Sequence, residues 1–220
     1  MISGKVSIFK ELYENPMRNL NNVTRYSGVF CMKPENDGYH TIDMMAMCMK
    51  IADLIEMDQE DVKDPILIDR KDLIYRCYLH DMDESLMGDI SRNIKYYNND
   101  IYNAISNVVD DLMSSAFSDK ITNDIKYSKD RDNICGLIVK ISDTLQSSMK
   151  IYEECRLGNF HFKKIIEENI TFVRNLKEII SSSKFSDESY QSCRAISTLL
   201  EIVDEFDSKL GDEIKRLSNY

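Results

Sequence analysis

Hydrophobic positions recur at three- and four-residue spacing over most of the chain, which is the period of an amphipathic α-helix. The clearest example is residues 40–57, whose apolar positions on adjoining turns are Ile42, Met45, Met49, Ala52 and Ile55. This spacing predicts a strongly apolar helix that is buried over nearly all of its surface.

The same period predicts helices in much of the remaining chain. They cover residues 8–20 with a break at Pro16, 66–82, 100–117, 133–156, 160–181 and 187–217. Residues 21–38 are expected to be irregular, and the polar residues 119–132 to form a loop with a helical piece. No segment requires a strand and no internal repeat is visible. We therefore expect an all-α single domain of roughly six to eight helices, covering residues 1–220.

Composition and charge narrow the classes of function. The chain has 220 residues, with 28 Lys and Arg against 38 Asp and Glu, so its formal net charge is -10. An acidic surface disfavours duplex nucleic acid and anionic membranes, which are bound through Lys and Arg. A small phosphorylated substrate is still compatible, because a divalent cation held by carboxylates reverses the local field. No apolar run reaches the roughly 18 residues of a membrane span.

The cysteines indicate a redox compartment. Six are present, none in a C-x-x-C pair: Cys31, Cys48, Cys77, Cys135, Cys155 and Cys193. Zinc-ribbon and thioredoxin motifs are therefore excluded. The sequence Met-Ile-Ser-Gly-Lys at the start shows no secretory signal. We expect reduced thiols in a cytoplasmic protein.

Candidate metal ligands lie at three places. His80 and Asp81 lie at the C-terminal end of the predicted helix 66–82, and His40 begins another apolar helix. Asp143 interrupts the apolar stripe of residues 133–156, where a carboxylate is unfavourable unless it is paired or binds a metal. From spacing alone, a shared metal site and an ordinary ion pair between Asp143 and Lys140 are about equally supported.

Three sequence motifs occur in a fixed order around these residues. They comprise Arg25-Tyr26 with Glu35-Asn36 and His40; His80-Asp81 with Glu84, Gly88-Asp89-Ile90 and Ile94-Lys95-Tyr96; and Ile138-Val139-Lys140-Ile141-Ser142-Asp143 with Gly158-Asn159. In these motifs the chain resembles the 5′-deoxynucleotidase branch of the HD-domain metal phosphohydrolases. The resemblance covers about residues 20–165 and fades in the C-terminal helices, about 166–220. It implies an HD-domain helical bundle.

The resemblance also implies a metal centre. His40, His80, Asp81 and Asp143 would ligate one divalent ion, and two imidazoles with two carboxylates suit cobalt, manganese, zinc, iron or magnesium. Such an ion activates water and polarises a phosphate group. Asp81, as a ligand of this ion, and Glu84, as general acid or base, are the implied catalytic residues.

Substrate-binding roles follow from the same resemblance. Arg25 would clamp a phosphate, Asp89 would accept the sugar 3′-hydroxyl and Lys95 would be a second phosphate contact. Tyr26 stands where the branch has Trp, which leaves discrimination between deoxyribose and ribose open. Arg92, in a segment where the branch has prolines, adds a charge that suits more than one phosphate. The third histidine, His161, lies outside the motifs and is interpreted as structural.

The implied activity is removal of the 5′-phosphate from deoxynucleoside monophosphates. The alternative at the same site is a triphosphohydrolase or pyrophosphohydrolase of deoxynucleoside triphosphates. A non-catalytic helical interaction module is a remoter alternative, which the presence of all four ligands and Glu84 argues against. We expect a deoxynucleotide as the partner, no duplex nucleic acid, no membrane, and a homo-oligomer of two or more chains.

Overall fold

The protein is all α-helical in the part of the chain that the computed structural model describes, which is residues 14–63, 65–95, 97–131, 133–183 and 190–218. Its long helices are α2 (Asp37–Met57), α3 (Arg70–Leu79), α6 (Asn99–Ala116), α7 (Asp119–Ser128), α8 (Ile134–Arg156), α9 (Lys163–Ser181) and α10 (Tyr190–Leu217). Single turns form α4 (Glu84–Met87) and α5 (Arg92–Lys95), and 3-10 turns form η1 (Pro16–Asn22) and η2 (Phe160–Phe162). The predicted fold class is confirmed.

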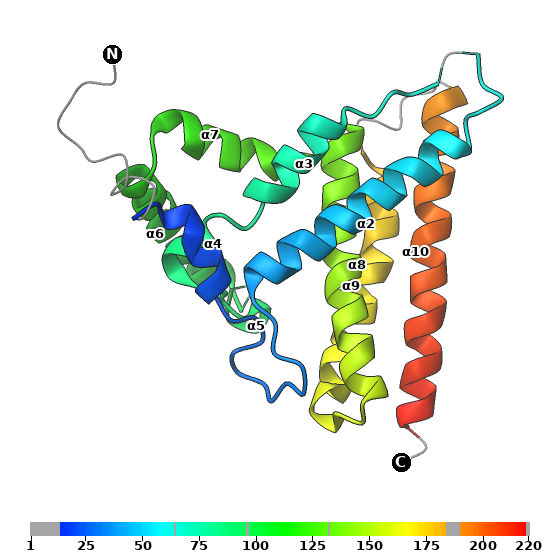
Figure 1. Ribbon diagram of the computed structural model, residues 1–220. Helices are drawn as coiled ribbons and strands as arrows, with labels where there is room; N and C mark the ends of the chain where they lie inside the picture. Colours follow the sequence, from blue (N-terminus) through cyan, green and yellow to red (C-terminus); the bar gives the residue numbers. More distant parts are fainter. Residues whose placement is uncertain (1–13, 64, 96, 132, 184–189, 219–220) are drawn as a thin grey trace.

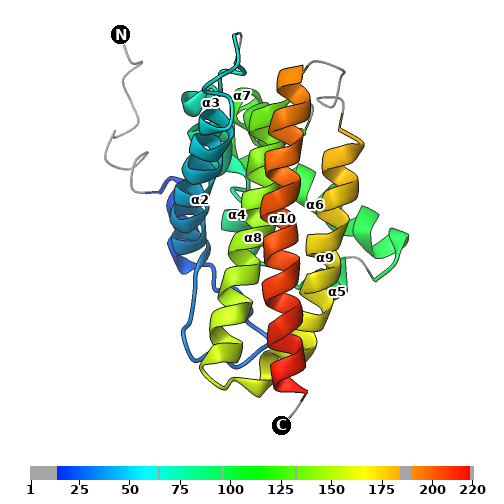
Figure 2. The same cartoon turned by 90° about the vertical axis from the view of Figure 1, so that its right-hand side faces the viewer.

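Helix α8 is the central element of the bundle. It packs against α2, α3, α9 and α10, and Figures 1 and 2 show α8, α9 and α10 running side by side. Helices α4, α6 and α7 lie to one side of α2 (Figure 1). The metal-ligand candidates therefore belong to α2, to α8 and to the end of α3, three elements that pack against one another.

The core follows from the apolar stripes of these helices. Ile138, Ile141 and Leu145 of α8 are fully buried and belong to a cluster that also includes side chains of α2, α9 and α10. Burying one such side chain stabilises a fold by about 1.5 to 3 kcal/mol. A smaller cluster joins η1 to α6, α7 and the end of α3, through Leu20, Met113, Ile125, Leu79 and Met82. Both clusters flank the candidate site and hold its elements in place.

Helix ends are set by polar caps, which explains one boundary that the sequence pattern misplaced. The side chain of Asp69 accepts hydrogen bonds from the backbone N–H groups of Lys71 and Asp72. Helix α3 therefore begins at Arg70, whereas periodicity predicted a helix over residues 66–82. Similarly, Ser118 caps the N-terminus of α7, and this helix over residues 119–128 is the helical piece expected within residues 119–132.

The structure also differs from the predicted pattern at α2 and at η1. The prediction that residues 40–57 are nearly all buried was wrong, because Ile42 of α2 is 67% exposed. Pro16 starts the 3-10 turn η1, so residues 16–20 do not form part of the predicted α-helix. Most of the predicted helix 8–20 and the start of the helix 187–217 lie outside the described residues. Between described residues, strand-like pairing is limited to an isolated bridge of Thr24 with Asn36.

No helix in the described ranges is long and apolar enough to cross a membrane.

Candidate metal centre and active site

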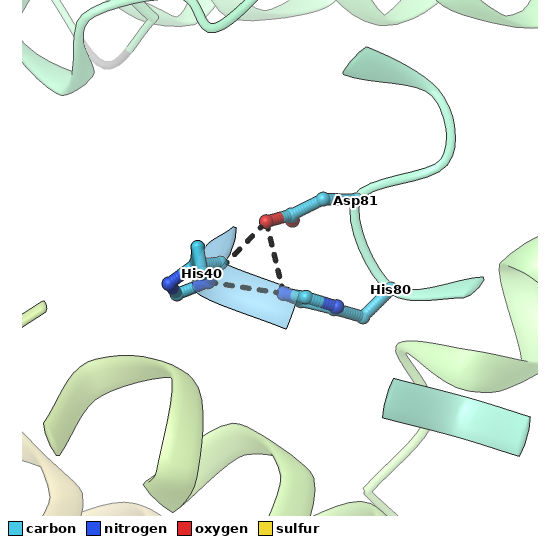
Figure 3. Close-up of side chains that lie close together, drawn as sticks. All are labelled: His40, His80 and Asp81. Carbon is cyan, nitrogen blue, oxygen red and sulfur yellow. Dashed lines mark hydrogen bonds and ion pairs between the residues drawn. The ribbon is translucent and has the colours of Figure 1, made fainter. Parts of the chain in front are cut away.

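Two buried imidazoles form the centre of the site. His40 lies in the first turn of α2, and His80 is the residue that caps the C-terminus of α3. Their Nε2 atoms are 3.3 Å apart. Figure 3 shows both rings pointing toward each other and toward the carboxylate of Asp81. The close approach brings together two residues that are 40 positions apart in the sequence.

Hydrogen bonds at the outer ring nitrogens fix the tautomers of both imidazoles. His80 Nδ1 lies 2.8 Å from the carbonyl oxygen of Cys77, which can only accept, so Nδ1 carries the proton. His40 Nδ1 faces Oε1 of Gln146. The Gln146 amide is oriented by Glu35, whose carboxylate accepts from Nε2 of Gln146 at 3.3 Å. In the neutral rings, both inward-facing Nε2 atoms are therefore unprotonated and offer lone pairs.

Two carboxylates complete this group of electron-pair donors. Asp81 Oδ2 lies 2.9 Å from His80 Nε2 and 3.5 Å from His40 Nε2. Asp143 Oδ1 lies 3.6 Å from His40 Nε2, and its other oxygen accepts from Lys140 Nζ at 2.9 Å. The ligand atoms of His40, His80 and Asp81 lie within 4.8 Å of one another, and Asp143 adjoins this group through its contact with His40. Imidazole nitrogens and carboxylate oxygens that only accept fit a divalent metal ion. The ion pair with Lys140 and the metal site are thus compatible, because each uses a different oxygen of Asp143.

The ionisation of the group reflects the same need for positive charge. Burial on its own would lower the pKa of His80, but the adjacent Asp81 carboxylate raises it overall. Burial would correspondingly raise the pKa of Asp81, but His80 and His40 hold it well below its usual range. A protonated imidazole can therefore supply positive charge beside Asp81, as a bound metal ion would.

A second carboxylate group adjoins the first. Oxygens of Asp37, Asp81 and Glu84 lie within 4.8 Å of one another. One oxygen of Asp37 and one of Glu84 are buried without a hydrogen-bond partner among the described residues. Burial, followed by the charges of Asp81 and Asp37, raises the pKa of Glu84 to about 11. Glu84 is therefore protonated at neutral pH in the absence of a metal, and can donate a proton. The sequence interpretation missed Asp37, although it lies one helical turn before His40 on α2.

Arg25 joins the two carboxylate groups. Its Nη1 donates to Asp37 at 3.0 Å and to Asp81 at 3.5 Å, and its Nη2 donates to Ser147 at 3.3 Å. Burial would lower the pKa of Arg25, but Asp81 and the other nearby anionic groups raise it overall. The guanidinium is therefore a permanent positive charge beside the candidate metal ligands.

The remaining predicted substrate contacts lie around Arg25. Tyr26 adopts a left-handed backbone conformation with φ of 56°, and its N–H donates to Asp89 Oδ2 at 3.4 Å. Tyr26 and Asp89 are thereby held next to each other. Lys95, on α5, lines the same cavity as Asp81 and Glu84 and forms no ion pair with another described residue. His161 lies outside this group, with its ring 6.1 Å from that of Phe30.

Two cavities meet at Arg25 and Asp89, which line both. The larger, about 550 Å³, is bordered by metal-ligand candidates, by Glu84 and by side chains of α6 and α7. Its other basic residues are Lys95, Lys126, Lys129, Arg131 and Lys140. The smaller, about 360 Å³, is bordered by residues 26–29, α8 and α9. The site can therefore bind a ligand that extends on both sides of the guanidinium.

A buried carboxylate on α8 holds the loop that carries Arg25 and Tyr26. Glu154 accepts from the backbone N–H groups of Met32 and Lys33, both at 2.9 Å. It also accepts from Lys150 Nζ at 2.7 Å and from Asn159 Nδ2 at 2.8 Å. Sequence reasoning did not identify Glu154, because nothing in its local pattern marks it as a loop anchor.

The chain is similar to known proteins in sequence. The family model described as 5′-deoxynucleotidase YfbR-like matches residues 13–193. A curated 5′-deoxynucleotidase from Shewanella oneidensis is 34% identical over 89 residues, which are 38% of this chain. The matched region spans 46% of that relative's length.

Solved structures of low sequence identity share the fold. An HD-domain phosphohydrolase from Listeria innocua has a TM-score of 0.65 at 17% identity, over 95% of this chain and 96% of that one. A cyanophage S-2L HD phosphohydrolase, bound to dA and one catalytic Zn²⁺ ion, has a TM-score of 0.59 at 11% identity, over 89% and 96% of the two chains. With the family match covering most of the sequence, the chain belongs to the YfbR-like 5′-deoxynucleotidase family.

Proposed function

We propose that this protein is a metal-dependent phosphohydrolase that removes the 5′-phosphate of deoxynucleoside monophosphates. The observation that carries the proposal is the convergence of two imidazole lone pairs with carboxylate oxygens of Asp81 and Asp143, beside the guanidinium of Arg25. Membership of the YfbR-like family and the curated relative from Shewanella oneidensis support it.

The proposed cofactor is one divalent metal ion held by His40, His80, Asp81 and Asp143. The cyanophage relative, with its catalytic Zn²⁺, supports a metal in this fold, and cobalt, manganese, zinc, iron and magnesium are all compatible with these donors. When bound, the ion would supply an activated water and positive charge for the phosphate oxygens.

The protein's own side chains would position the substrate and move protons. Arg25 would bind the phosphate through its guanidinium, with Lys95 as a second contact. Glu84 would hold a proton at its buried carboxyl oxygen and deliver it toward the leaving 5′-oxygen. Asp89 would accept the sugar 3′-hydroxyl, and Tyr26, fixed against Asp89, would lie beside the sugar.

A second candidate function is hydrolysis of deoxynucleoside triphosphates at the same site. The basic residues around the larger cavity favour it, because a triphosphate carries more negative charge than one guanidinium and one metal ion neutralise. Lys126 and Lys129 are paired with Asp110 and Asp83, which reduces the charge available to a substrate. The monophosphate therefore remains our first proposal.

A product-resolved assay distinguishes these functions. The protein would be incubated with each metal and with deoxynucleoside mono- and triphosphates and ribonucleoside monophosphates, and phosphate, pyrophosphate and tripolyphosphate would be separated. We expect phosphate from the deoxynucleoside monophosphates and none after His80→Ala. Pyrophosphate or tripolyphosphate as the main product would establish the second candidate. If no product forms and no metal is bound, the remaining interpretation is a non-catalytic helical interaction module.

Assembly and location are further proposals. We propose a homo-oligomer of at least two chains, each a single domain over residues 1–220, in the cytoplasm. The exposed apolar side chains of Tyr39 and Ile42, one turn apart on α2, support association between copies. Light scattering of the purified protein tests the oligomeric state, and a monomeric mass would contradict it.

A further inference from the structure

The smaller cavity lies beside the candidate metal centre, and none of the metal-ligand candidates lines it. Its mouth is formed by Arg25 and Asp89, and Tyr26 lies beside them. Helix α9 contributes Ile165, Glu168, Asn169 and Phe172 to the lining, and their spacing of three and four residues places them on one helix face. Ile151 of α8 adds to the apolar surface of Ile165 and Phe172 in this wall, which also has the polar side chains of Ser147, Glu168 and Asn169. Such a lining suits a flat heterocycle.

Asn169 is a buried polar residue in this wall. Its side chain is 4% exposed, and its amide oxygen Oδ1 is buried without a hydrogen-bond partner in the described part of the chain. Buried polar atoms in folded proteins are nearly always paired, so an unpaired acceptor on a residue that lines a cavity indicates a partner outside the chain. A ligand group with an N–H would satisfy this oxygen.

We propose that the smaller cavity binds the nucleobase of the substrate and that Asn169 recognises it. The inference rests on the proposed function, which assigns the phosphate to Arg25 and the sugar 3′-hydroxyl to Asp89 at the mouth of the same cavity. A nucleoside whose sugar lies at Asp89 extends its base toward α9. There, Oδ1 of Asn169 accepts a hydrogen bond from a base N–H, and Tyr26 and Phe172 contact the ring.

The polar atoms of this wall also select among bases. Glu168 is a second acceptor on the same face of α9, and its contact with Lys164 is a loose 3.6 Å. Two acceptors match the amino groups of adenine, cytosine and guanine, whereas thymine offers a single N–H. We therefore expect a preference for the amino-bearing bases over thymine.

The experiment compares substrates with and without a base. The value of kcat/KM is measured for dAMP, dCMP, dGMP, dTMP and 2-deoxyribose 5-phosphate, in the wild type and in Asn169→Leu. Leucine has a similar volume and removes the unpaired acceptor, so the variant is expected to fold. We expect kcat/KM for the amino-bearing nucleotides to fall about tenfold through KM, with 2-deoxyribose 5-phosphate changed less than twofold.

A matched control is Thr122→Val. Thr122 Oγ1 is likewise buried without a partner among the described residues, but Thr122 lines neither cavity. This variant should leave all five substrates unaffected. An equal loss for 2-deoxyribose 5-phosphate in Asn169→Leu, or no loss for any nucleotide, would overturn the assignment of Asn169. If Asn169→Leu does not fold, Asn169→Ser is judged by the same comparison.

A binding measurement separates this inference from the proposed function. If the wild type hydrolyses none of the five substrates, the proposed activity is wrong. Calorimetric titration with deoxyadenosine and with thymidine then tests the nucleobase site by itself. Tighter binding of deoxyadenosine that is weakened about tenfold in Asn169→Leu would support the site. Absence of nucleoside binding, or equal binding by wild type and variant, would contradict it.

Discussion

At the scale of single residues, the site depends on groups that hold other groups in one protonation state. Gln146 and the carbonyl of Cys77 keep the Nδ1 protons of His40 and His80 in place, so that both Nε2 atoms face inward as lone pairs. Glu35 in turn orients the Gln146 amide. Metal affinity should therefore depend on residues that never contact the metal.

Replacing Gln146 tests this dependence. In Gln146→Leu, His40 Nδ1 loses its acceptor and the ring can adopt the other tautomer, so we expect metal affinity to fall about 10- to 100-fold. Titration with metal, followed by calorimetry, measures the affinity. Activity at saturating metal should return to near the wild-type value. Unchanged affinity would show that the tautomer of His40 is not set by Gln146.

Replacing Glu84 should lower the rate of hydrolysis without changing metal binding. Its carboxyl group is buried against Asp37 and Asp81, with a pKa raised to about 11, so it carries a proton that glutamine cannot transfer. We expect Glu84→Gln to lower kcat by 10²- to 10⁴-fold. Metal content, measured by elemental analysis, should remain one ion per chain. By contrast, Asp81→Asn should lose both metal and turnover; equal metal loss in the two variants would refute the assigned difference.

At the scale of elements, hydrogen bonds anchor the loop of residues 24–36 to α8. Glu154 is buried and accepts four hydrogen bonds from this loop and its surroundings, while Lys150 also donates to the carbonyl of Lys33. Asn159 links the same carboxylate to the carbonyl of Phe30. The position of Arg25 in the site therefore depends on contacts near the far end of α8.

The anchor predicts a pH dependence of stability. Burial alone would raise the pKa of Glu154, but hydrogen bonds led by those from Asn159 and Lys150 lower it to about 2. A pKa lower in the folded state than in the unfolded state stabilises the fold above the unfolded value, near 4.3, and this contribution is lost as pH falls toward 2. In Glu154→Gln, one of the acceptors becomes a donor facing a backbone N–H.

We expect Glu154→Gln to lower the free energy of unfolding by about 3 kcal/mol at pH 7. Urea denaturation at pH 7, 4 and 2.5 measures it, and the gap from the wild type should narrow as pH falls. The exposed pair of Lys33 with Glu153 offers a control: Glu153→Gln should change stability by less than about 1 kcal/mol at every pH. A constant gap for Glu154→Gln would contradict the assigned pKa.

Elements that bury one long apolar stripe were predictable from sequence, and elements defined by capping were less so. The helix over residues 133–156 was placed within a residue of α8. The helix over residues 66–82 was too long at both ends, because Asp69 caps α3 and the chain turns at His80. Periodicity records burial of side chains, whereas helix ends depend on single hydrogen bonds.

At the scale of the whole molecule, the site joins segments that are distant in sequence. The ligand candidates were identified from motifs, since each motif preserves a local pattern around one ligand. Asp37, Gln146, Glu154 and Asn169 were not identified, because their roles arise only where α2, α8 and α9 pack together. The net charge of -10 is consistent with this arrangement, because several acidic side chains converge on the candidate metal position.

A metal that binds between α2, α8 and the end of α3 should stabilise the folded protein as a whole. A ligand that binds only the folded state adds about 2.7 kcal/mol at a free concentration 100 times its Kd. For a chain of this size that corresponds to a rise in Tm of roughly 5 to 10 °C. Scanning calorimetry of the protein after chelation, and again after adding metal, measures the shift. Asp143→Asn removes one ligand charge and should abolish most of it, whereas Thr122→Val should retain it. A Tm that is independent of metal in the wild type would show that these helices are not joined through a bound ion.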